Sequence, residues 1–451
     1  MSELKRDLGV WGAASIVVGT VIGSGIFLVP KSMVQNVGSA EMVIFVFIFG
    51  GLLSLAGALT YAELSAAMPE AGGEYVYLRE AYGPFFAFLY GWTQMWVAKS
   101  GSIATLATAF FTYMANFVPA LEGVITEFHL PLLGVLTIKT GQIFAMVVIG
   151  LLGWLNYFGV KVGGNVQIGV TVVKVGLIAV LIVAGLTFSG GSMANFSSSV
   201  PAPGGVAGFF AALVAALWAY DGWNNVSMVS SEVKNPQKNL PLALVYGTVA
   251  VMAIYILANL AYFYVLSASE VEGSDRVAAA MMRQVWGAGG ANAVSIAAMI
   301  SIFAALNGSI LTGARVPYAM ARDGLFFRSI GDVHPKYFTP ANSIIALTAW
   351  SMVLILSGGY DQLFTYVIFA SWILYGMATA SVLVLRHKRP DLPRPYRAVG
   401  YPVVPIVFVV VAAALIVSTL QKSPRESLLG LGIMATGIPF YLHWKRKLKA
   451  K

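Results

Sequence analysis

The sequence predicts an all-α membrane protein with twelve transmembrane helices, and three observations lead to that fold class. Of its 451 residues, 58% are hydrophobic and only 10% are charged, whereas soluble globular domains carry about 25% charged residues. Several windows of about twenty residues, the length that crosses a hydrocarbon core, contain no ionisable side chain. The connectors between these windows are short, so we expect no separate soluble domain.

The predicted spans follow one another along the chain, and residues 1–451 are expected to form one transmembrane domain. The first apolar run is too long for a cleavable signal peptide and lacks its small-residue end, so we expect it to be the first span. The twelve spans are predicted near residues 10–36, 42–67, 84–118, 138–159, 163–188, 205–230, 240–266, 288–320, 340–357, 362–385, 401–420 and 427–444.

Lysine and arginine predict how the chain is oriented in the bilayer. With both termini placed in the cytoplasm, 19 of the 28 basic residues fall in cytoplasmic segments, 6 in external segments and 3 within spans. Membrane proteins concentrate positive charge on the cytoplasmic side, so we expect both termini there. The net charge of +9 then reflects contact with anionic lipid, and no nucleic-acid partner is expected.

The residue inventory argues against an enzyme. The chain has no cysteine, which excludes disulfides, thiolate nucleophiles and cysteine-bound metal. Its four histidines lie in connectors or at span ends, where they cannot activate a nucleophile inside the membrane. Walker, HExxH and GxSxG motifs are also missing. We therefore predict no catalytic residue, no cofactor and no metal site, and any transport should be driven by gradients.

Two predicted spans contain residues that disfavour a continuous helix. The first includes the run Gly19 to Gly25 (GTVIGSG), in which each glycine costs about 1 kcal/mol relative to alanine. The sixth includes Trp218 to Asn224 (WAYDGWN), and a carboxylate at membrane depth costs roughly 2.5 to 3.5 kcal/mol. Small residues alone more often indicate helix packing. Interruptions at corresponding positions of two halves instead indicate an inverted-repeat transporter.

This pairing predicts two repeats of five helices, over approximately residues 8–190 and 203–388, with helices 11 and 12 outside them at about 400–445. An unwound turn exposes backbone groups that lipid cannot satisfy, so such a turn persists only where it lines a cavity. The sequence therefore places a site where the interruptions in spans 1 and 6 face each other.

Four ordered motifs resemble those of amino acid/polyamine/organocation (APC) permeases, and specifically the L-type amino acid transporter branch. The resemblance covers essentially the whole chain and implies a LeuT-like 5+5 fold with helices 1 and 6 broken. The motifs are Gly19 to Phe27 (GTVIGSGIF), Tyr61 to Pro84 (YAELSAAMPEAGGEYVYLREAYGP), Ala219 to Asn224 (AYDGWN) followed by Ser231 to Pro241 (SEVKNPQKNLP), and Leu306 to Gly324 (LNGSILTGARVPYAMARDG).

The resemblance also implies how an amino acid would be held. Its carboxylate suits the free N–H groups at the start of a half-helix, where the helix dipole is positive, and its ammonium suits carbonyl groups at a helix end. The resemblance assigns the carboxylate to Gly23, Ser24 and Gly25. It assigns the ammonium to Val21, Trp218 and Asp221.

Three of the expected site residues have more than one interpretation. Trp218 matches an aromatic gate over the substrate, although packing is the usual role of a membrane tryptophan. Asp221 either faces the cavity, where it would favour a cationic side chain, or caps the helix that follows. Asn307 is a candidate for hydrogen bonding in the site or for helix packing. The substrate side chain is not predicted, although Ser102, Phe303 and Tyr366 are candidates for the pocket.

Lys174 lies too deep in the fifth span to reach the membrane surface, so it must find partners within the protein or lose its proton. By the resemblance, it occupies the position that Na⁺ takes in sodium-coupled relatives, between helices 1 and 8. Carbonyls near Val18 and Gly19, together with the Ser301 region, are its expected partners. This predicts sodium-independent transport.

Two further buried ionisable groups are expected to have partners. Lys99 should pair with a carboxylate or face the cytoplasmic vestibule. Glu63 should pair with one of the cations Lys99, Arg315 or Arg322.

The expected function is a sodium-independent exchanger of L-amino acids that works by alternating access. One alternative is a proton-coupled symporter, for which Asp221 and Glu63 are the available span carboxylates. Another is an amino acid-sensing receptor, which the short connectors disfavour. Eukaryotic members of the branch carry an external cysteine joined to a heavy chain. Residues 119–137 contain none, so we expect a functional monomer without a disulfide-linked heavy subunit, in a bacterial inner membrane.

Overall fold

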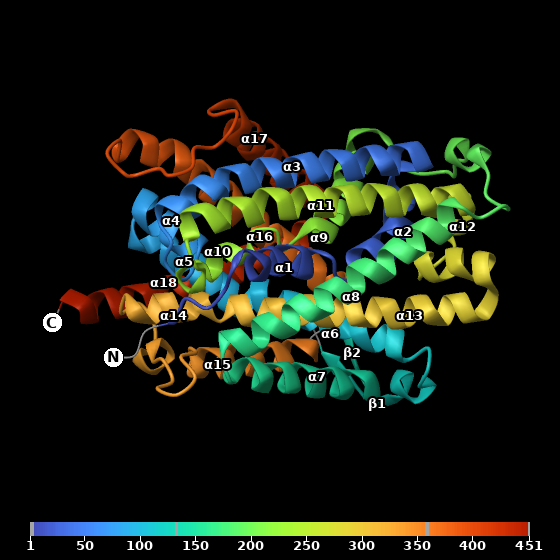
Figure 1. Ribbon diagram of the computed structural model, residues 1–451. Coiled ribbons are helices and arrows are strands. Elements are labelled where there is room, and N and C mark those ends of the chain that lie inside the picture. The colour runs from blue at the N-terminus through green and yellow to red at the C-terminus, as the bar shows by residue number, and fades with distance from the viewer. Residues whose placement is uncertain (1–3, 131–133, 357–359, 450–451) are drawn as a thin grey trace.

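The computed structural model describes residues 4–130, 134–356 and 360–449. Within these residues the chain forms a bundle in which the long helices share one general direction (Figure 1). The helices are α1 (Val10–Val21), α2 (Gly25–Val37), α3 (Ala40–Ala67), α4 (Glu74–Tyr82), α5 (Pro84–Thr93), α6 (Lys99–Met114), α7 (Thr140–Tyr157), α8 (Val160–Leu186), α9 (Gly205–Tyr220), α10 (Asn225–Met228), α11 (Pro236–Val265), α12 (Ala268–Glu272), α13 (Val277–Gly313), α14 (Arg315–Arg322), α15 (Ala341–Ile355), α16 (Tyr360–Lys388), α17 (Val403–Lys422) and α18 (Pro424–Lys449).

Seven helical segments among the described residues are long and apolar enough to cross a membrane, by length and composition. Two shorter apolar helices, α9 and α15, accompany them. The seven segments are Val10–Val37, Ala40–Ala67, Thr140–Tyr157, Val160–Leu186, Pro236–Val265, Val277–Arg322 and Val403–Lys422. The structure is thus that of a helical membrane protein, and the expected total of twelve crossings stays a prediction.

The third predicted span has an internal irregularity, and a kink lies directly before the predicted eighth span. The third, predicted over 84–118, consists of α5, a π-helical turn over Gln94–Ala98, and α6. In α13 the backbone leaves helical geometry at Trp286 and Gly287, so the part of α13 before this kink is distinct from the part that follows. The kink lies directly before residue 288, where the sequence predicts the eighth span to begin.

The connector 119–137 contains a β-hairpin, which the all-α prediction did not include. Strands β1 (Val124–Leu130) and β2 (Gly134–Lys139) pair antiparallel and form the single sheet found in the described ranges. Apolar and polar residues partly alternate along both strands (VITEFHL and GVLTIK), as in a strand with two different faces. The span-scale hydropathy windows are too long to detect segments of this length.

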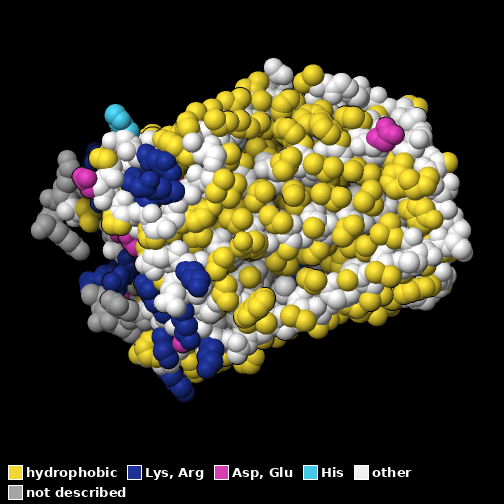
Figure 2. All heavy atoms as spheres, turned by 45° about the horizontal axis from the view of Figure 1, so that its top comes forward, with side chains coloured by type: hydrophobic (Ala, Val, Ile, Leu, Met, Phe, Trp, Pro, Cys, Tyr) yellow, Lys and Arg dark blue, Asp and Glu magenta, His cyan; other side chains and the backbone are white. Residues whose placement is uncertain are grey.

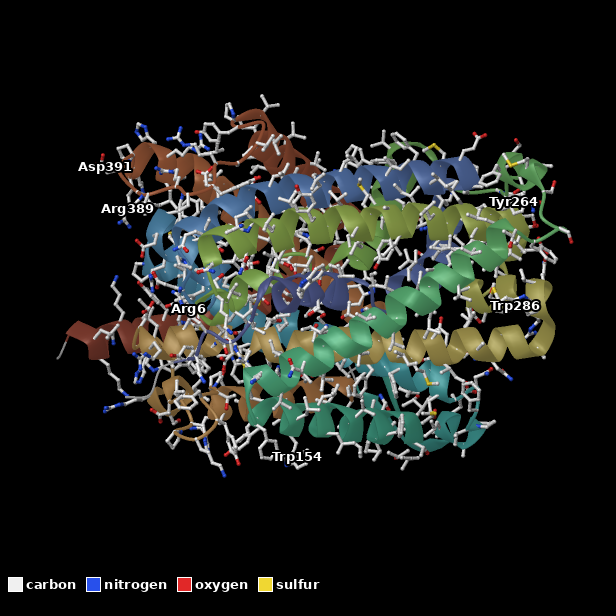
Figure 3. All side chains as sticks on the ribbon, viewed as in Figure 1. Arg6, Trp154, Tyr264, Trp286, Arg389 and Asp391 are labelled. Atoms are coloured by element: carbon white, nitrogen blue, oxygen red, sulfur yellow. The ribbon has the colours of Figure 1, made fainter. Side chains whose placement is uncertain are left out.

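Basic and hydrophobic side chains occupy different parts of the molecular surface. Lysine and arginine gather at one end, and hydrophobic side chains cover the surface between the ends (Figure 2). The N- and C-terminal ends of the chain lie at the basic end (Figure 1). Figure 3 places Arg389 and Asp391 there, and Tyr264 and Trp286 at the opposite end. This distribution is typical of a protein that crosses a bilayer with its basic residues on one side.

Candidate functional site

The first junction, residues 22–24, separates α1 from α2 and leaves backbone groups without helical partners. Here the Gly23 N–H donates a hydrogen bond of 2.8 Å to the Val21 carbonyl across a tight turn. The first N–H groups of α2 have no acceptor within their own helix and form the positive end of its dipole. Gly25 is needed at this position because a Cβ would lie 2.5 Å from the Cα of Ala219. The two interrupted segments can therefore approach each other closely.

The second junction, residues 221–224, separates α9 from α10. Gly222 has a φ of 106°, a backbone conformation that other residues rarely adopt. Its carbonyl accepts a hydrogen bond of 3.0 Å from the Thr20 hydroxyl on α1. The Asp221 N–H donates to the Trp218 carbonyl over 3.1 Å. The two segments are thus in contact, although they are about 200 residues apart in the sequence.

Tyr255 on α11 joins the ends of α1 and α9, and no pattern in the sequence predicted this contact. Its hydroxyl lies 2.9 Å from the Val21 carbonyl and 2.8 Å from the Ala219 carbonyl, and its side chain is fully buried. A hydroxyl has one proton, which these two carbonyls share, and the Val21 carbonyl also accepts from the Gly23 N–H. A tyrosine in an apolar run gives no signal of such a role, because its facing direction depends on tertiary packing.

Lys174 on α8 contacts the backbone at the end of α1 and at the first junction. Its ammonium donates to the carbonyls of Gly19 (2.7 Å) and Ile22 (2.5 Å), and the residue is 0% exposed. The Ser301 hydroxyl on α13 donates to the same Ile22 carbonyl over 2.8 Å. Of the two carbonyls predicted as partners, Gly19 accepts from Lys174, whereas Ile22 takes the place expected for Val18. The ammonium thus satisfies carbonyls that the end of α1 leaves open.

A small cavity of about 20 Å³ lies between the two junctions. That volume holds little more than one water molecule, so an amino acid can enter only if the surrounding helices or side chains move. Six of the predicted binding residues line it, namely Val21, Gly23, Ser24, Gly25, Trp218 and Asp221, and so does the pocket candidate Ser102. The rest of its lining is Thr20, Leu106, Gly222, Asn225 and Ser309.

The side chains at the second junction bring charge to this cavity. The Asp221 carboxylate accepts a hydrogen bond of 2.9 Å from the Tyr375 hydroxyl on α16. Lys99, the first residue of α6, donates to the Asn225 side chain over 2.6 Å and interacts electrostatically with Asp221. Trp218 is 5% exposed and covers one side of the cavity from the last turn of α9. The structure therefore gives the Asp221 carboxylate partners outside α10.

Asn307 lies outside the set of residues that line the cavity. Its side chain donates to Gln167 (2.9 Å) and to the Gly163 carbonyl (3.3 Å), and it accepts from Asn156 (2.9 Å). These contacts join α13 to α7 and α8, so the helix-packing alternative describes its position. Phe303 is likewise not among the lining residues, and Tyr366 lies outside the side chains that the structure describes.

The buried ion pairs differ from those expected. Glu63 accepts from Arg386 (2.6 Å) and lies 3.3 Å from Arg394, so its predicted pairing with Lys99, Arg315 or Arg322 is wrong. Arg386 lies near the end of α16, and Arg394 lies in the connector that follows. Both are more than 300 residues from Glu63 in the sequence, so no sequence pattern indicated that they lie beside α3. Arg315 instead pairs with Glu232 over 2.7 Å, and both side chains are buried. Within the described residues, no group of three or more His, Asp or Glu side chains could hold a metal ion.

Comparison with known proteins identifies the family to which the chain belongs. The family model described as amino acid permease matches residues 8–436. The serine/threonine exchanger SteT of Bacillus subtilis is 34% identical over 450 residues, covering 98% of each chain. The b(0,+)-type amino acid transporter 1 of Mus musculus is 32% identical and the cystine/glutamate transporter of Homo sapiens is 31% identical. The alignments cover 98% and 99% of this chain, and 88% and 87% of those proteins.

These relatives are transporters and not enzymes, and the bundle has the apolar helices that transport across a bilayer requires. The resemblance found in the sequence motifs is confirmed over almost the whole chain. The chain belongs to the amino acid permease family of the APC superfamily, within its L-type-like branch, and is a multi-pass membrane transporter of amino acids.

Proposed function

We propose that this protein exchanges L-amino acids across the plasma membrane by alternating access, without coupling to sodium. In this proposal residues 1–451 form one domain of twelve spans, with 5+5 inverted repeats over about 8–190 and 203–388. The two junctions are then the unwound parts of helices 1 and 6. The similarity to a serine/threonine exchanger over 98% of the chain supports exchange as the transport mode.

The substrate carboxylate would bind the N–H groups of Gly23, Ser24 and Gly25. The ammonium would bind carbonyls of the opposite half-helices, at Val21, Trp218 and Asp221. The position of Tyr255 suggests how Val21 becomes free: its hydroxyl also reaches the Ala219 carbonyl, so it can donate there while the ammonium takes its place. Trp218 would move to admit the substrate, because the closed cavity is only about 20 Å³.

The single observation that carries sodium independence is the position of the Lys174 ammonium. It bonds two carbonyls of the first junction, and Ser301 bonds one of them from α13. Carbonyl and hydroxyl oxygens are the ligands that a bound Na⁺ would also use at a helix end. A covalently attached cation at this place removes the need for a dissolved one, so substrate binding should not require sodium.

The proposal also covers partners and location. Because the site lies within one chain, we propose a functional monomer without a disulfide-linked heavy subunit; the sequence contains no cysteine to make such a link. The basic end of the molecule (Figure 2) suits the cytoplasmic face. Both termini would then be cytoplasmic, in a bacterial inner membrane.

Uptake into proteoliposomes tests the proposal. Vesicles are loaded with unlabelled amino acid or left empty, and uptake of labelled amino acid is measured with Na⁺ present or replaced by choline. We expect uptake only into loaded vesicles, and at the same rate in both salts. Uptake into empty vesicles that follows an imposed proton gradient would replace exchange with symport. A requirement for Na⁺ would contradict the role given to Lys174, and binding without any uptake would indicate a sensing receptor.

A further inference from the structure

Glu74 is a buried carboxylate that has no cation at salt-bridge distance. Three glutamates are buried among the described residues: Glu63, Glu74 and Glu232. Arginine pairs with the first and the third. Glu74, at 0% exposure, is held by neutral donors instead. Burying an ionised carboxylate without a paired charge is costly, so this group requires a separate explanation.

Two of the donors to Glu74 come from the second junction and from α10, which follows it. Asn224 donates from its side-chain amide to Oε1. Ser227 on α10 lies 3.5 Å from Oε2, and the Tyr90 hydroxyl on α5 donates to Oε2 over 2.9 Å. In addition, the Gly72 N–H donates to the Met228 carbonyl over 2.9 Å. The start of α4 and the turn before it therefore hold α10 in place.

This attachment lies between the cavity and the basic end of the molecule. Asn224 belongs to the second junction, and the next residue, Asn225, lines the cavity and accepts from Lys99. Glu74 lies at the beginning of α4, which connects to the end carrying Arg79 and Arg389 (Figures 1 and 3). If the cavity opens toward that end by movement of α10 away from α4, Glu74 loses its Asn224 and Ser227 donors.

We propose that Glu74 holds the cavity closed on its cytoplasmic side while it is ionised, and that a proton taken up by Glu74 releases α10. Charge-assisted hydrogen bonds are about twice as strong as neutral ones, so protonation weakens the attachment to Asn224 and Ser227. Protonation also removes the cost of leaving a bare carboxylate when α10 moves. Glu74 is thus a positioning residue that acts through α10, and this role rests on the exchange function proposed above.

The surroundings of Glu74 are compatible with a proton that binds and leaves. The charge of Lys99 on α6 favours the ionised form of the Glu74 carboxyl. Four tyrosines also lie close enough to interact electrostatically with this carboxylate: Tyr61 on α3, Tyr77 on α4, Tyr90 on α5 and Tyr375 on α16. Burial raises the pKa of the Glu74 carboxyl above its usual range, against the opposing effect of its hydrogen bonds and Lys99. The group therefore takes up a proton at a higher pH than an exposed glutamate.

Exchange measured with the same pH on both sides of the vesicle tests this role, because no proton gradient is present to drive symport. In loaded proteoliposomes we expect wild-type exchange to accelerate severalfold as the pH falls from about 8 to about 6. Glu74→Gln imitates the protonated state and should exchange rapidly with little dependence on pH. Glu80→Gln, on the same helix but at an exposed ion pair with Arg389, should keep the wild-type pH profile.

A Glu74→Gln protein that exchanges with the wild-type pH profile would overturn the proposal, and so would a flat wild-type profile. If Glu74→Gln does not fold, Tyr90→Phe provides the second test. It removes one donor from the carboxylate and should move the midpoint of the profile upward by about one pH unit; an unchanged midpoint would contradict the role. Failure of the exchange function would appear differently, as uptake into empty vesicles at every pH.

Discussion

The two junctions face the same cavity but are held in different ways. The first, residues 22–24, is held through its backbone carbonyls by the Lys174 ammonium and the Ser301 hydroxyl. The second, residues 221–224, is held largely through side chains, by Tyr375 on Asp221 and by Glu74 on Asn224. A fixed buried cation on backbone groups allows little exchange of partners. Side-chain hydrogen bonds can be exchanged, so we expect the first junction to stay in place while the second moves.

Removal of the Lys174 ammonium, which contacts the first junction, should have the largest effect on exchange. Lys174→Ala removes hydrogen bonds to two carbonyls, each worth about 1.5 to 3 kcal/mol when a charged group is involved, and exchange should fall by at least about 100-fold. The measurement is counterflow uptake by purified protein whose folding is verified by size-exclusion chromatography. Lys161→Ala is the matched control, because Lys161 is an exposed lysine on the same helix. Near-normal exchange by Lys174→Ala would remove the distinction between the junctions.

A substitution that prevents the close approach of the two segments should reduce exchange nearly as strongly. In Gly25→Ala the new Cβ would lie 2.5 Å from the Ala219 Cα, so α2 and α9 must separate, at a cost of about 1 to 3 kcal/mol. We expect lower thermal stability and roughly a tenfold or greater loss of exchange. Gly169→Ala is the control, because a Cβ there meets nothing within 4 Å. Equal behaviour of the two variants would show that the junctions do not need this contact.

The link between the two junctions can be removed while the ring is kept. Tyr255→Phe deletes the hydroxyl that reaches Val21 and Ala219, and one such hydrogen bond is worth about 0.5 to 1.5 kcal/mol. Because the hydroxyl holds the end of α9 through the Ala219 carbonyl when the substrate ammonium is bound at Val21, we expect a several-fold rise in the half-saturating substrate concentration, measured by initial exchange rates. An effect confined to the maximal rate would mean that Tyr255 controls movement of the helices rather than binding.

Removal of the Asp221 carboxylate at the second junction should have the smallest effect on the exchange of neutral substrates. Asp221→Asn keeps the backbone carbonyl and can still accept from Tyr375, so neutral amino acids should change by no more than about threefold. Competition by lysine or arginine against a neutral amino acid measures the charge effect. Weaker competition by cationic substrates in the variant would show that Asp221 contacts the substrate side chain. Equal competition would leave Asp221 with a structural role at Tyr375.

The sequence predicted those features that depend on local composition. Glycine at 23 and 25, and Asp221 next to Gly222, placed the two junctions, because these residues are unfavourable in a membrane helix. Lys174 was also predictable, since a buried ammonium must find oxygen partners. Its contact with Gly19 followed from the resemblance to relatives in which a cation lies beside helix 1.

Features that depend on the direction of a side chain were not predictable. Asn307 was a candidate for hydrogen bonding in the site or for helix packing, and the sequence could not decide between them; its side chain packs against α7 and α8. Tyr255 and Glu74 were missed because one lies in an apolar run and the other in a connector, where the sequence gives no facing direction. The partner of Glu63 was assigned wrongly for a related reason: Arg386 is 323 residues away in sequence. Only the packed helices bring such groups together.

The most direct test of the account asks whether the substrate needs both of its charged groups. In the loaded-vesicle assay, a transported amino acid, its methyl ester and its deaminated acid compete with the labelled substrate. If the first junction binds the carboxylate and the opposite carbonyls bind the ammonium, both analogues should compete at least about 100-fold more weakly than the amino acid, because each leaves buried polar groups unpaired. Competition by either analogue as strong as that of the amino acid would contradict the account.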